Sequence, residues 1–359
     1  MDDSILPGQR LRARGADSNR VGRFEGAQRA AFADGWDIPE DDRLVATETR
    51  LERPRSAISW NRSPDLPFDR AINPYRGCEH GCVYCYARPS HAFLGLSPGL
   101  DFETRLVARP GIAEVLATEL RRPGYRPAPI AIGTMTDPYQ PVEREHRLLR
   151  AILTVLADFG HPVWITTRGT LVERDIDLIA PMAARGLAAV SISVTTLDAT
   201  LARQMEPRAP APARRLQIIR RLSEAGIPVR IQVSPLIPAL TDHELEAVME
   251  AGAEAGARFA DAIPLRLPRE VAGLFRDWLA TTLPDRAARV MGRVRELHGG
   301  RDYDPAFGTR MTGQGLWADL IGRRAELARR RLGLGSALPA LRSDAFRPPP
   351  AAGEQLSLF

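Results

Sequence analysis

The sequence predicts an α/β protein in which parallel strands alternate with helices. Short apolar runs recur between residues 128 and 267, and stretches with helical periodicity separate them. Strands separated by helices of this length pair in parallel and are joined by right-handed crossovers. Five or six such units can form a partial or complete barrel, or an open doubly wound sheet, and the pattern does not distinguish these architectures. In each of them the chemistry lies at the carboxyl ends of the strands.

Four regions are expected along the 359-residue chain. Residues 1–60 are polar with little periodicity, which indicates an irregular N-terminal extension. A barrel is expected over 61–275, a helical region over 276–340 and a proline-rich tail over 341–359. Within the barrel, apolar runs predict buried strands at residues 128–133, 162–166, 188–194, 229–237 and 260–267.

Helical periodicity is clearest in three segments. Residues 143–159 and 214–226 lie between predicted strands, and the second ends in glycine, a typical helix stop. The third segment, 315–333, places three leucines on one side and five arginines near them: Leu316, Leu320, Leu327, Arg323, Arg324, Arg329, Arg330 and Arg331. These arginines form either the solvated face of a packed helix or a contact to nucleic acid.

The composition bounds both the location and the chemistry of the protein. Hydrophobic residues make up 44% of the chain, enough for a sizeable core, and no run of 18 apolar residues predicts a membrane span. The first residues lack the apolar segment of a secretory signal, and clustered cysteines favour a reducing compartment, so a cytoplasmic location is expected. All 49 basic residues are arginine, which excludes Schiff-base lysine chemistry and the lysine-dependent phosphate loop.

All three cysteines of the chain lie in one short stretch, NPYRGCEHGCVYCYAR. Cys78, Cys82 and Cys85 have the spacing C-x3-C-x2-C. A structural zinc site would need a fourth ligand, which His80 or His91 could supply. A cubane iron–sulfur cluster normally takes four thiolates, so three leave one iron with an open coordination position. An open position suits a catalytic centre.

This spacing, with the aromatic residue Tyr84 before the last cysteine, resembles the signature of radical S-adenosylmethionine (radical SAM) enzymes. The resemblance implies a 4Fe–4S cluster on Cys78, Cys82 and Cys85, with S-adenosylmethionine on the open iron and Tyr84 near its adenine. In that family the reduced cluster cleaves the cofactor to methionine and a 5′-deoxyadenosyl radical, which abstracts hydrogen from the substrate. An electron donor such as flavodoxin or ferredoxin is also implied.

Further blocks resemble the spore photoproduct lyase-like branch of that superfamily, whose proteins are often labelled DNA repair photolyases. Besides the cysteine motif they are GTMTDPYQPVE at 133–143, TTRGTLVERDIDL at 166–178 and IQVSPLIP at 231–238. The similarity covers residues 60 to 270 and implies a partial (β/α)6 barrel. It also implies a lyase-like activity on DNA, with a damaged pyrimidine as the substrate.

Several polar residues near predicted strand ends are candidates for binding S-adenosylmethionine, again by resemblance: Thr167, Arg168, Ser193 and Thr195. Glu206 and Arg208 either bind the cofactor's carboxylate or ribose, or form a loop salt bridge. Asp137 either caps a turn or contacts cofactor or substrate. His80 is expected to stabilise the cysteine loop rather than to ligate metal.

One departure from the branch concerns the hydrogen-atom donor. The spore enzyme is understood to use an additional cysteine to return a hydrogen atom to the product radical, and this chain has no fourth cysteine. Tyr86 and Tyr139 are the candidate replacements by their positions in the motifs. Otherwise the reaction differs from reversal of the thymine photoproduct.

The last five residues, QLSLF, match the short consensus by which bacterial repair proteins dock on the replicative sliding clamp. Gln355 would supply amide hydrogen bonds, while Leu356, Leu358 and Phe359 would fill an apolar pocket. The proline-rich stretch before them would hold the peptide clear of the domain. The alternative is a terminal segment that packs on its own domain.

Three functions follow from these observations. The leading hypothesis is a radical SAM enzyme that acts on a DNA lesion and is recruited by the sliding clamp. The first alternative is a radical SAM enzyme with a protein, RNA or small-molecule substrate, which the missing cysteine favours. The second is a non-catalytic, clamp-associated protein whose metal centre is structural.

Overall fold

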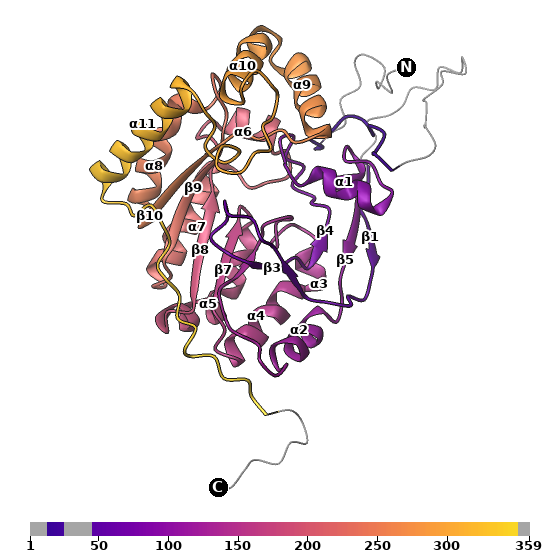
Figure 1. The fold of residues 1–359 in the computed structure, drawn as a ribbon, viewed down its shortest axis with the longest axis vertical. Coiled ribbons are helices and arrows are strands. Elements are labelled where there is room, and N and C mark those ends of the chain that lie inside the picture. Colours follow the sequence, from indigo (N-terminus) through magenta and orange to yellow (C-terminus); the bar gives the residue numbers. More distant parts are fainter. Residues whose placement is uncertain (1–12, 25–44, 351–359) are drawn as a thin grey trace.

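The main sheet of the molecule is a partial barrel (Figure 1). The computed structural model describes residues 13–24 and 45–350. In this part of the chain, seven strands pair in the order β10-β9-β8-β7-β6-β3-β2. The first six in that order are mutually parallel, and β2 runs antiparallel at the edge. The strands are β2 (Ile58–Trp60), β3 (Arg70–Ile72), β6 (Ile130–Ile132), β7 (Val163–Thr167), β8 (Ala188–Ser193), β9 (Val229–Leu236) and β10 (Phe259–Pro264).

The expected partial (β/α)6 barrel is therefore confirmed, although one of its strands was not predicted. The five apolar runs correspond to β6 through β10. The missed strand, β3, is three residues long, too short to show a period. It lies directly before the cysteine motif and thus begins the barrel.

Helices cover the outer face of the sheet, as Figure 1 shows for α2, α4, α5, α7 and α8. Alternate residues of β9 explain why: Val229, Ile231 and Val233 are buried against this layer, whereas Arg230 and Gln232 lie on the inner face. The helices are α2 (Ile112–Leu120), α3 (Glu143–His146), α4 (Leu148–Asp158), η2 (Thr170–Asp175), α5 (Ile176–Ala184), α6 (Ala199–Met205), α7 (Pro212–Glu224), η3 (Asp242–Glu244) and α8 (Leu245–Glu254).

A second, three-stranded sheet stands beside the start of the barrel, in the order β1-β5-β4. Its strand β1 (Glu48–Leu51), like β2, comes from the expected N-terminal extension. The cysteine loop leaves strand β4 and is followed by a short helical turn. The elements here are β4 (Tyr75–Arg76), η1 (Arg88–Leu94), α1 (Asp101–Thr104) and β5 (Arg105–Ala108).

The helical C-terminal region is also confirmed. Helices α9 (Glu270–Thr282) and α10 (Pro284–Leu297) form a second apolar core together with residues of the cysteine loop and α6. Helix α11 (Leu316–Leu332) packs on the barrel through small residues and one isoleucine, namely Ile321, Ala325 and Ala328. No helix in the described part of the chain is long and apolar enough to cross a membrane.

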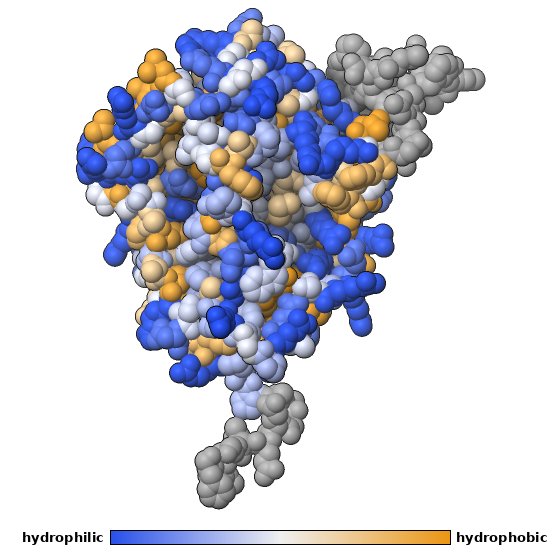
Figure 2. Space-filling view, viewed as in Figure 1, coloured by the Kyte–Doolittle hydropathy of each residue, from blue (hydrophilic) through white to orange (hydrophobic). Residues whose placement is uncertain are grey.

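The three leucines predicted to share one side of this last helix face solvent. Leu316, Leu320 and Leu327 are 82%, 50% and 65% exposed. Figure 2 shows separate hydrophobic patches among hydrophilic residues at the upper left, where α11 lies in Figure 1. The leucine spacing is helical, but the packing face is set by the smaller residues, which allow α11 to approach the barrel closely.

After α11 the chain crosses the amino ends of the barrel strands as an extended segment. The Arg342 N–H donates to the Gly186 carbonyl, just before β8, and the Arg347 N–H to the Phe159 carbonyl, just before β7, both at 2.9 Å. Phe346 packs against Phe159 and two further aromatic rings. We call residues 336–350 the C-terminal strap. The QLSLF motif lies outside the described residues.

Candidate active site at the cysteine loop

The cysteine loop, residues 77–87, has a left-handed backbone conformation, which favours glycine, at two positions. Gly77 and Gly81 have φ values of 79° and 67°. A Cβ on Gly77 would lie 2.9 Å from the Phe102 carbonyl oxygen, to which the Cys78 N–H donates at 2.8 Å. The loop thus turns sharply at these glycines and packs against α1, which contains Phe102. Cys78 and Cys82 are buried and Cys85 is partly exposed, all as free thiols.

An N-terminal segment lies directly against this loop. A Cβ on Gly15 would come within 1.7 Å of the Gly81 carbonyl oxygen, so no larger residue fits there. The Gly15 and Ala16 N–H groups donate to the buried Glu103 carboxylate at 2.9 Å. Arg88 completes the arrangement with a 2.5 Å ion pair to Glu103 and a 2.9 Å hydrogen bond to the Cys82 carbonyl. Part of the expected extension therefore contacts the loop.

Arg168, at the carboxyl end of β7, reaches the second cysteine. Its Nη1 lies 3.1 Å from Cys82 Sγ, 2.8 Å from the Tyr84 hydroxyl and 2.6 Å from Glu206 Oε1. Three other candidates from the sequence, Cys82, Tyr84 and Glu206, are thus brought together around the guanidinium group of Arg168.

Glu206 is the buried anion of this group. It accepts hydrogen bonds from the hydroxyls of Tyr84 and Thr195, and it is paired with Arg168 and Arg215. Burial would raise the pKa of the Glu206 carboxyl, but the two guanidinium groups outweigh it and lower the pKa to about 2. The carboxylate therefore stays charged and holds both arginines in place.

Asp137 forms a second buried junction beside the loop. Thr167 Oγ1 donates to it at 2.6 Å, and the N–H groups of Arg168 and Tyr139 donate at 2.9 Å. His80 Nδ1 lies 3.4 Å from the same carboxylate. Burial would raise the Asp137 pKa, but His80 and these hydrogen bonds lower it to about 2. Within the chain, Asp137 therefore caps the turn at residues 137–139 by accepting from the Tyr139 N–H.

The other candidates have mixed positions. Arg208 binds Glu79 of the loop at 3.1 Å, so it forms the loop salt bridge that the sequence left open. Ser193 is buried at the end of β8, and its carbonyl accepts a hydrogen bond from Arg215. Ser193 follows Ser191 by two residues along β8, so both lie on the inner face of the sheet, and it is paired with Gln232 of β9.

The two tyrosines proposed as hydrogen donors lie in different surroundings. Tyr86 is 42% exposed, donates its hydroxyl to the Thr134 carbonyl and has the Arg266 guanidinium 4.4 Å from its ring centroid. Tyr139 is 1% exposed and belongs to the apolar core between the barrel strands and the helices that cover them. Burial, together with the nearby Asp175 carboxylate, raises the Tyr139 pKa well above its usual value. In the described part of the chain, no hydrogen bond joins the Tyr139 hydroxyl to the cysteine loop.

Sequence reasoning missed several residues that shape this site. No sequence motif marks Glu103 or Arg215 as part of the site. Glu103 contacts Gly15, which is 88 positions away, and Arg215 lies on α7 while its partner Glu206 follows α6. Gln140 belongs to the quoted block TDPYQ, and its side chain bridges the loop by accepting from the Glu79 N–H at 2.9 Å and donating to the Gly77 carbonyl at 3.1 Å. That block could have indicated it.

The inner face of the barrel carries a polar row below the strand ends. Arg230 donates to Ser191 at 3.0 Å, and its guanidinium lies 3.9 Å from Asp261. Gln232 stands beside Asp261 in register, with a buried Oε1 that has no hydrogen-bond partner in the described part of the chain. Arg230, Gln232 and Asp261 therefore give this face both hydrogen-bond donors and acceptors for a polar ligand.

The arginines of α11 are largely engaged in ion pairs. Arg324 and Arg331 pair with Glu246 and Glu250 of α8, whereas Arg329 and Arg330 pair with Glu326. Of the five, Arg323 alone has no ion pair among the residues described. The structure therefore favours the solvated face of a packed helix over an open basic surface.

The chemistry of the three thiols suits a metal cluster. Burial raises the pKa of Cys82 to about 12 and that of Cys78 well above its usual value, and binding of a cation at these sulfurs releases their protons. Within the described residues, no group of three or more His, Cys, Asp or Glu side chains is arranged around a single metal ion. A cubane instead takes each thiolate at a different iron.

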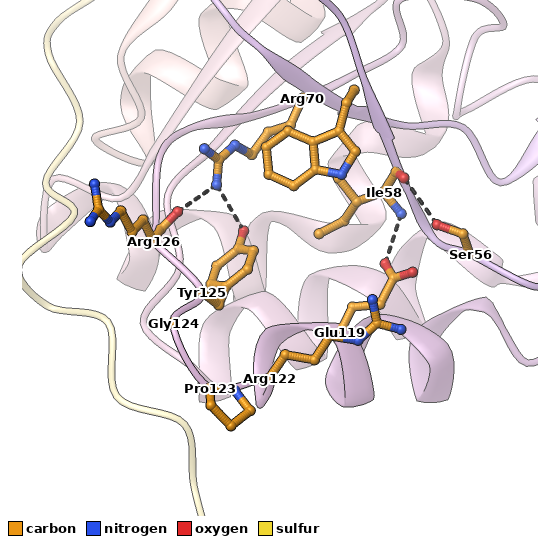
Figure 3. Close-up of a pocket in the computed structure, with 10 residues that line it drawn as sticks. Ser56, Ile58, Arg70, Glu119, Arg122, Pro123, Gly124, Tyr125 and Arg126 are labelled. Carbon is orange, nitrogen blue, oxygen red and sulfur yellow. Dashed lines mark hydrogen bonds between the residues drawn. The ribbon is translucent and has the colours of Figure 1, made fainter.

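A separate cavity of about 490 Å³ lies away from this loop (Figure 3). Arg70 crosses it, 4.6 Å from the Trp60 ring centroid and hydrogen-bonded to the Tyr125 hydroxyl. Arg70 is the first residue of β3, whereas the cysteine loop follows the other end of that strand. The cavity is therefore at the amino end of the barrel, opposite the carboxyl ends where the candidate residues gather.

Comparison with known proteins is consistent with this geometry. The chain matches the sequence model of the Radical SAM superfamily over residues 72–252. An uncharacterized protein of Mycobacterium tuberculosis is 37% identical over 289 residues, which cover 79% of this chain and 82% of that protein. An uncharacterized protein of Methanocaldococcus jannaschii is 27% identical over 48% of this chain and 62% of its own length.

Among solved structures, spore photoproduct lyase complexed with dinucleoside spore photoproduct has a similar fold. The TM-score is 0.58 at 14% sequence identity, and the match covers 80% of this chain and 81% of that chain.

Proposed function

This chain belongs to the radical SAM superfamily, and from that premise we propose that it acts on a lesion in DNA. Its cofactors are a 4Fe–4S cluster and S-adenosylmethionine. Cys78, Cys82 and Cys85 hold the cluster in this proposal. When bound, the cluster supplies an electron that splits S-adenosylmethionine into methionine and a hydrogen-abstracting 5′-deoxyadenosyl radical.

The residues around the loop exclude water and place the cofactor. Cys82, Val83 and Tyr84 are buried in the core formed with α9 and α10, which shields this side of the loop from solvent. The neighbouring strands β7 and β8 end at Thr167 and Ser193, and Arg168 and Thr195 follow them closely. These four residues lie beside the loop or its ion pairs. We assign to them the polar groups of S-adenosylmethionine, because they gather at the carboxyl ends of two adjacent strands, where the Arg168 guanidinium and the Thr195 hydroxyl meet at Glu206.

The substrate lies on the inner face in this proposal. Arg230 and Gln232 can donate to a base, while Asp261 and the unpartnered Gln232 oxygen can accept from one. A lesion base has to leave the stack to reach this face, which costs least for damaged bases. The single observation that carries the DNA proposal is the set of sequence blocks shared with the lyase branch. It is supported by the fold likeness to an enzyme solved with dinucleoside spore photoproduct.

Tyr86 is the hydrogen donor that we retain. Its ring is partly exposed, and it follows Cys85 directly in the chain. A product radical that takes the hydroxyl hydrogen from Tyr86 leaves a tyrosyl radical, and an electron from a flavodoxin- or ferredoxin-type donor, together with a proton from water, returns it to tyrosine. Tyr86→Phe should therefore leave 5′-deoxyadenosine formation intact but lower the yield of the restored base.

The decisive experiment is an anaerobic turnover assay with DNA. The protein is reconstituted with iron and sulfide, reduced with dithionite and given S-adenosylmethionine with oligonucleotides that are either ultraviolet-irradiated or intact. We expect irradiated DNA to raise 5′-deoxyadenosine formation at least tenfold and the photoproduct to disappear, both measured by mass spectrometry. A Cys82→Ala variant serves as the matched control and should form no 5′-deoxyadenosine.

Two results would redirect the proposal. Basal 5′-deoxyadenosine formation that no DNA increases would indicate a different substrate, which the missing fourth cysteine and the ion-paired arginines of α11 favour. A protein that folds and binds zinc but never cleaves S-adenosylmethionine would indicate a structural metal centre instead.

A further inference from the structure

The contact between Arg168 and Cys82 distinguishes one cysteine from the other two. Among the hydrogen bonds of the described residues, Cys82 Sγ is the one cysteine sulfur with a partner, at 3.1 Å from Arg168 Nη1. The Arg168 side chain is 16% exposed, so its charge is poorly screened by water. We infer that Arg168 is a positioning residue that raises the reduction potential of the cluster through Cys82 Sγ.

The guanidinium cannot easily turn away from the sulfur. Its backbone N–H is held by Asp137 at 2.9 Å, and its side chain is held by Glu206 at 2.6 Å and by Tyr84 at 2.8 Å. Glu206 is in turn paired with Arg215, whose side chain is 1% exposed. The sulfur therefore faces a donor whose position is fixed from both ends.

The net charge beside Cys82 is positive. Of the charged groups that act on Cys82, Arg168 and Arg215 share the single carboxylate of Glu206, which leaves one positive charge in excess, whereas the Asp137 carboxylate acts on Cys78. Arg88, which contacts the Cys82 carbonyl, is neutralised by its own ion pair with Glu103. A positive charge and a hydrogen bond at a ligand sulfur stabilise the reduced cluster, because reduction adds one electron to the cluster and its thiolates.

The test is a redox titration of Arg168→Gln followed by electron paramagnetic resonance. The reconstituted full-length protein is titrated anaerobically with dithionite in the absence of S-adenosylmethionine, and iron and sulfide are counted in the same samples. We expect the equilibrium constant for reduction to fall about tenfold, which is about 59 mV for a one-electron couple. Full iron content with a wild-type midpoint potential would overturn the inference.

Arg208→Gln is the matched control. Arg208 is bound to the same loop through Glu79, but it has no hydrogen bond to a cysteine sulfur among the described residues. The cluster of the Arg208→Gln variant should therefore have the midpoint potential of the wild type. Equal shifts in both variants would mean that total charge, rather than the sulfur contact, sets the potential, and would also overturn the inference.

A second variant decides the matter if Arg168→Gln fails to retain iron. Glu206→Gln keeps a side-chain oxygen that can accept the hydrogen bond from Arg168 Nη1, and it removes the negative charge that offsets the guanidinium. The inference therefore requires a higher midpoint potential in this variant. An unchanged or lower potential would contradict it. The inference rests on the cluster and not on DNA as the substrate, so a negative DNA assay leaves it standing, and an unchanged potential leaves the DNA proposal standing.

Discussion

Glu206 and Asp137 illustrate how single residues acquire their roles at this site. Both are carboxylates that burial would neutralise, and in both the surrounding donors lower the pKa to about 2. They remain charged at all physiological pH values and organise the hydroxyl, amide and guanidinium groups around them. At the residue scale, the site is therefore an arrangement of fixed charges that the chain's own hydrogen bonds and ion pairs hold together.

His161 provides a prediction at this scale that is independent of the cysteines. It is fully buried, its Nδ1 donates to the Pro162 carbonyl at 3.0 Å and its Nε2 accepts from the Tyr125 hydroxyl at 2.8 Å. Burial lowers the His161 pKa from 6.5 to about 4, so the fold favours the neutral ring. Its contribution to stability is complete above pH 6.5 and is lost as the pH falls through 4, at a cost of about 3 kcal/mol.

We therefore expect the free energy of unfolding, measured with urea between pH 7 and 4, to fall less steeply in His161→Gln than in the wild type. His243→Gln is the matched control, because the His243 side chain is 69% exposed and should leave the slope unchanged. Identical slopes for all three proteins would show that His161 titrates normally in the fold.

At the scale of secondary structure, helix α11 shows how packing selects a face. Its periodic leucines point outward, whereas Ile321, Ala325 and Ala328 contact the barrel layer. Small side chains permit close approach to α8 and β10, and the ion pair between Arg324 and Glu246 fixes the helix at that contact. Hydrophobicity alone did not identify the buried side, because the three largest apolar residues that the sequence placed together are all exposed.

This assignment predicts opposite outcomes for two neighbouring substitutions. Ile321→Ala should lower the free energy of unfolding by 2 to 4 kcal/mol, roughly the cost of a buried cavity. Leu320→Ala, one position earlier and 50% exposed, should change it by less than about 0.5 kcal/mol. Urea unfolding of both variants measures the difference. Equal losses would mean that the exposed leucine is buried in solution against a partner or a second copy of the chain.

At the scale of the whole molecule, the two terminal regions lie at opposite ends of the barrel. The N-terminal segment contacts the cysteine loop through Gly15 and Glu103. The C-terminal strap instead crosses the amino ends of the strands, and its Pro349 carbonyl accepts a hydrogen bond from Arg121 at the end of α2. Figure 1 shows this path down one side of the molecule and away from the loop.

The position of the strap bears on the proposed clamp peptide. The last described residues lie at the amino end of the barrel, away from the cysteine loop. We therefore propose that binding of the clamp and turnover at the loop are independent. We expect deletion of Gln355–Phe359 to weaken binding to a bacterial sliding clamp at least tenfold, measured by surface plasmon resonance, while 5′-deoxyadenosine formation is unchanged. A chain with the same five residues scrambled is the control. Full-length protein that does not bind the clamp would refute the motif assignment.

The sequence by itself determined the strands β6 to β10, the parallel α/β architecture and the cysteine spacing that indicates the cluster. These features repeat or lie close together along the chain, so they leave a local pattern. The tertiary structure decided which side chains meet. Arg168 and Cys82 are 86 positions apart, and Gly15 and Glu103 are 88 apart. Contacts of this kind follow from how strands and loops are stacked in space, and no local periodicity records them.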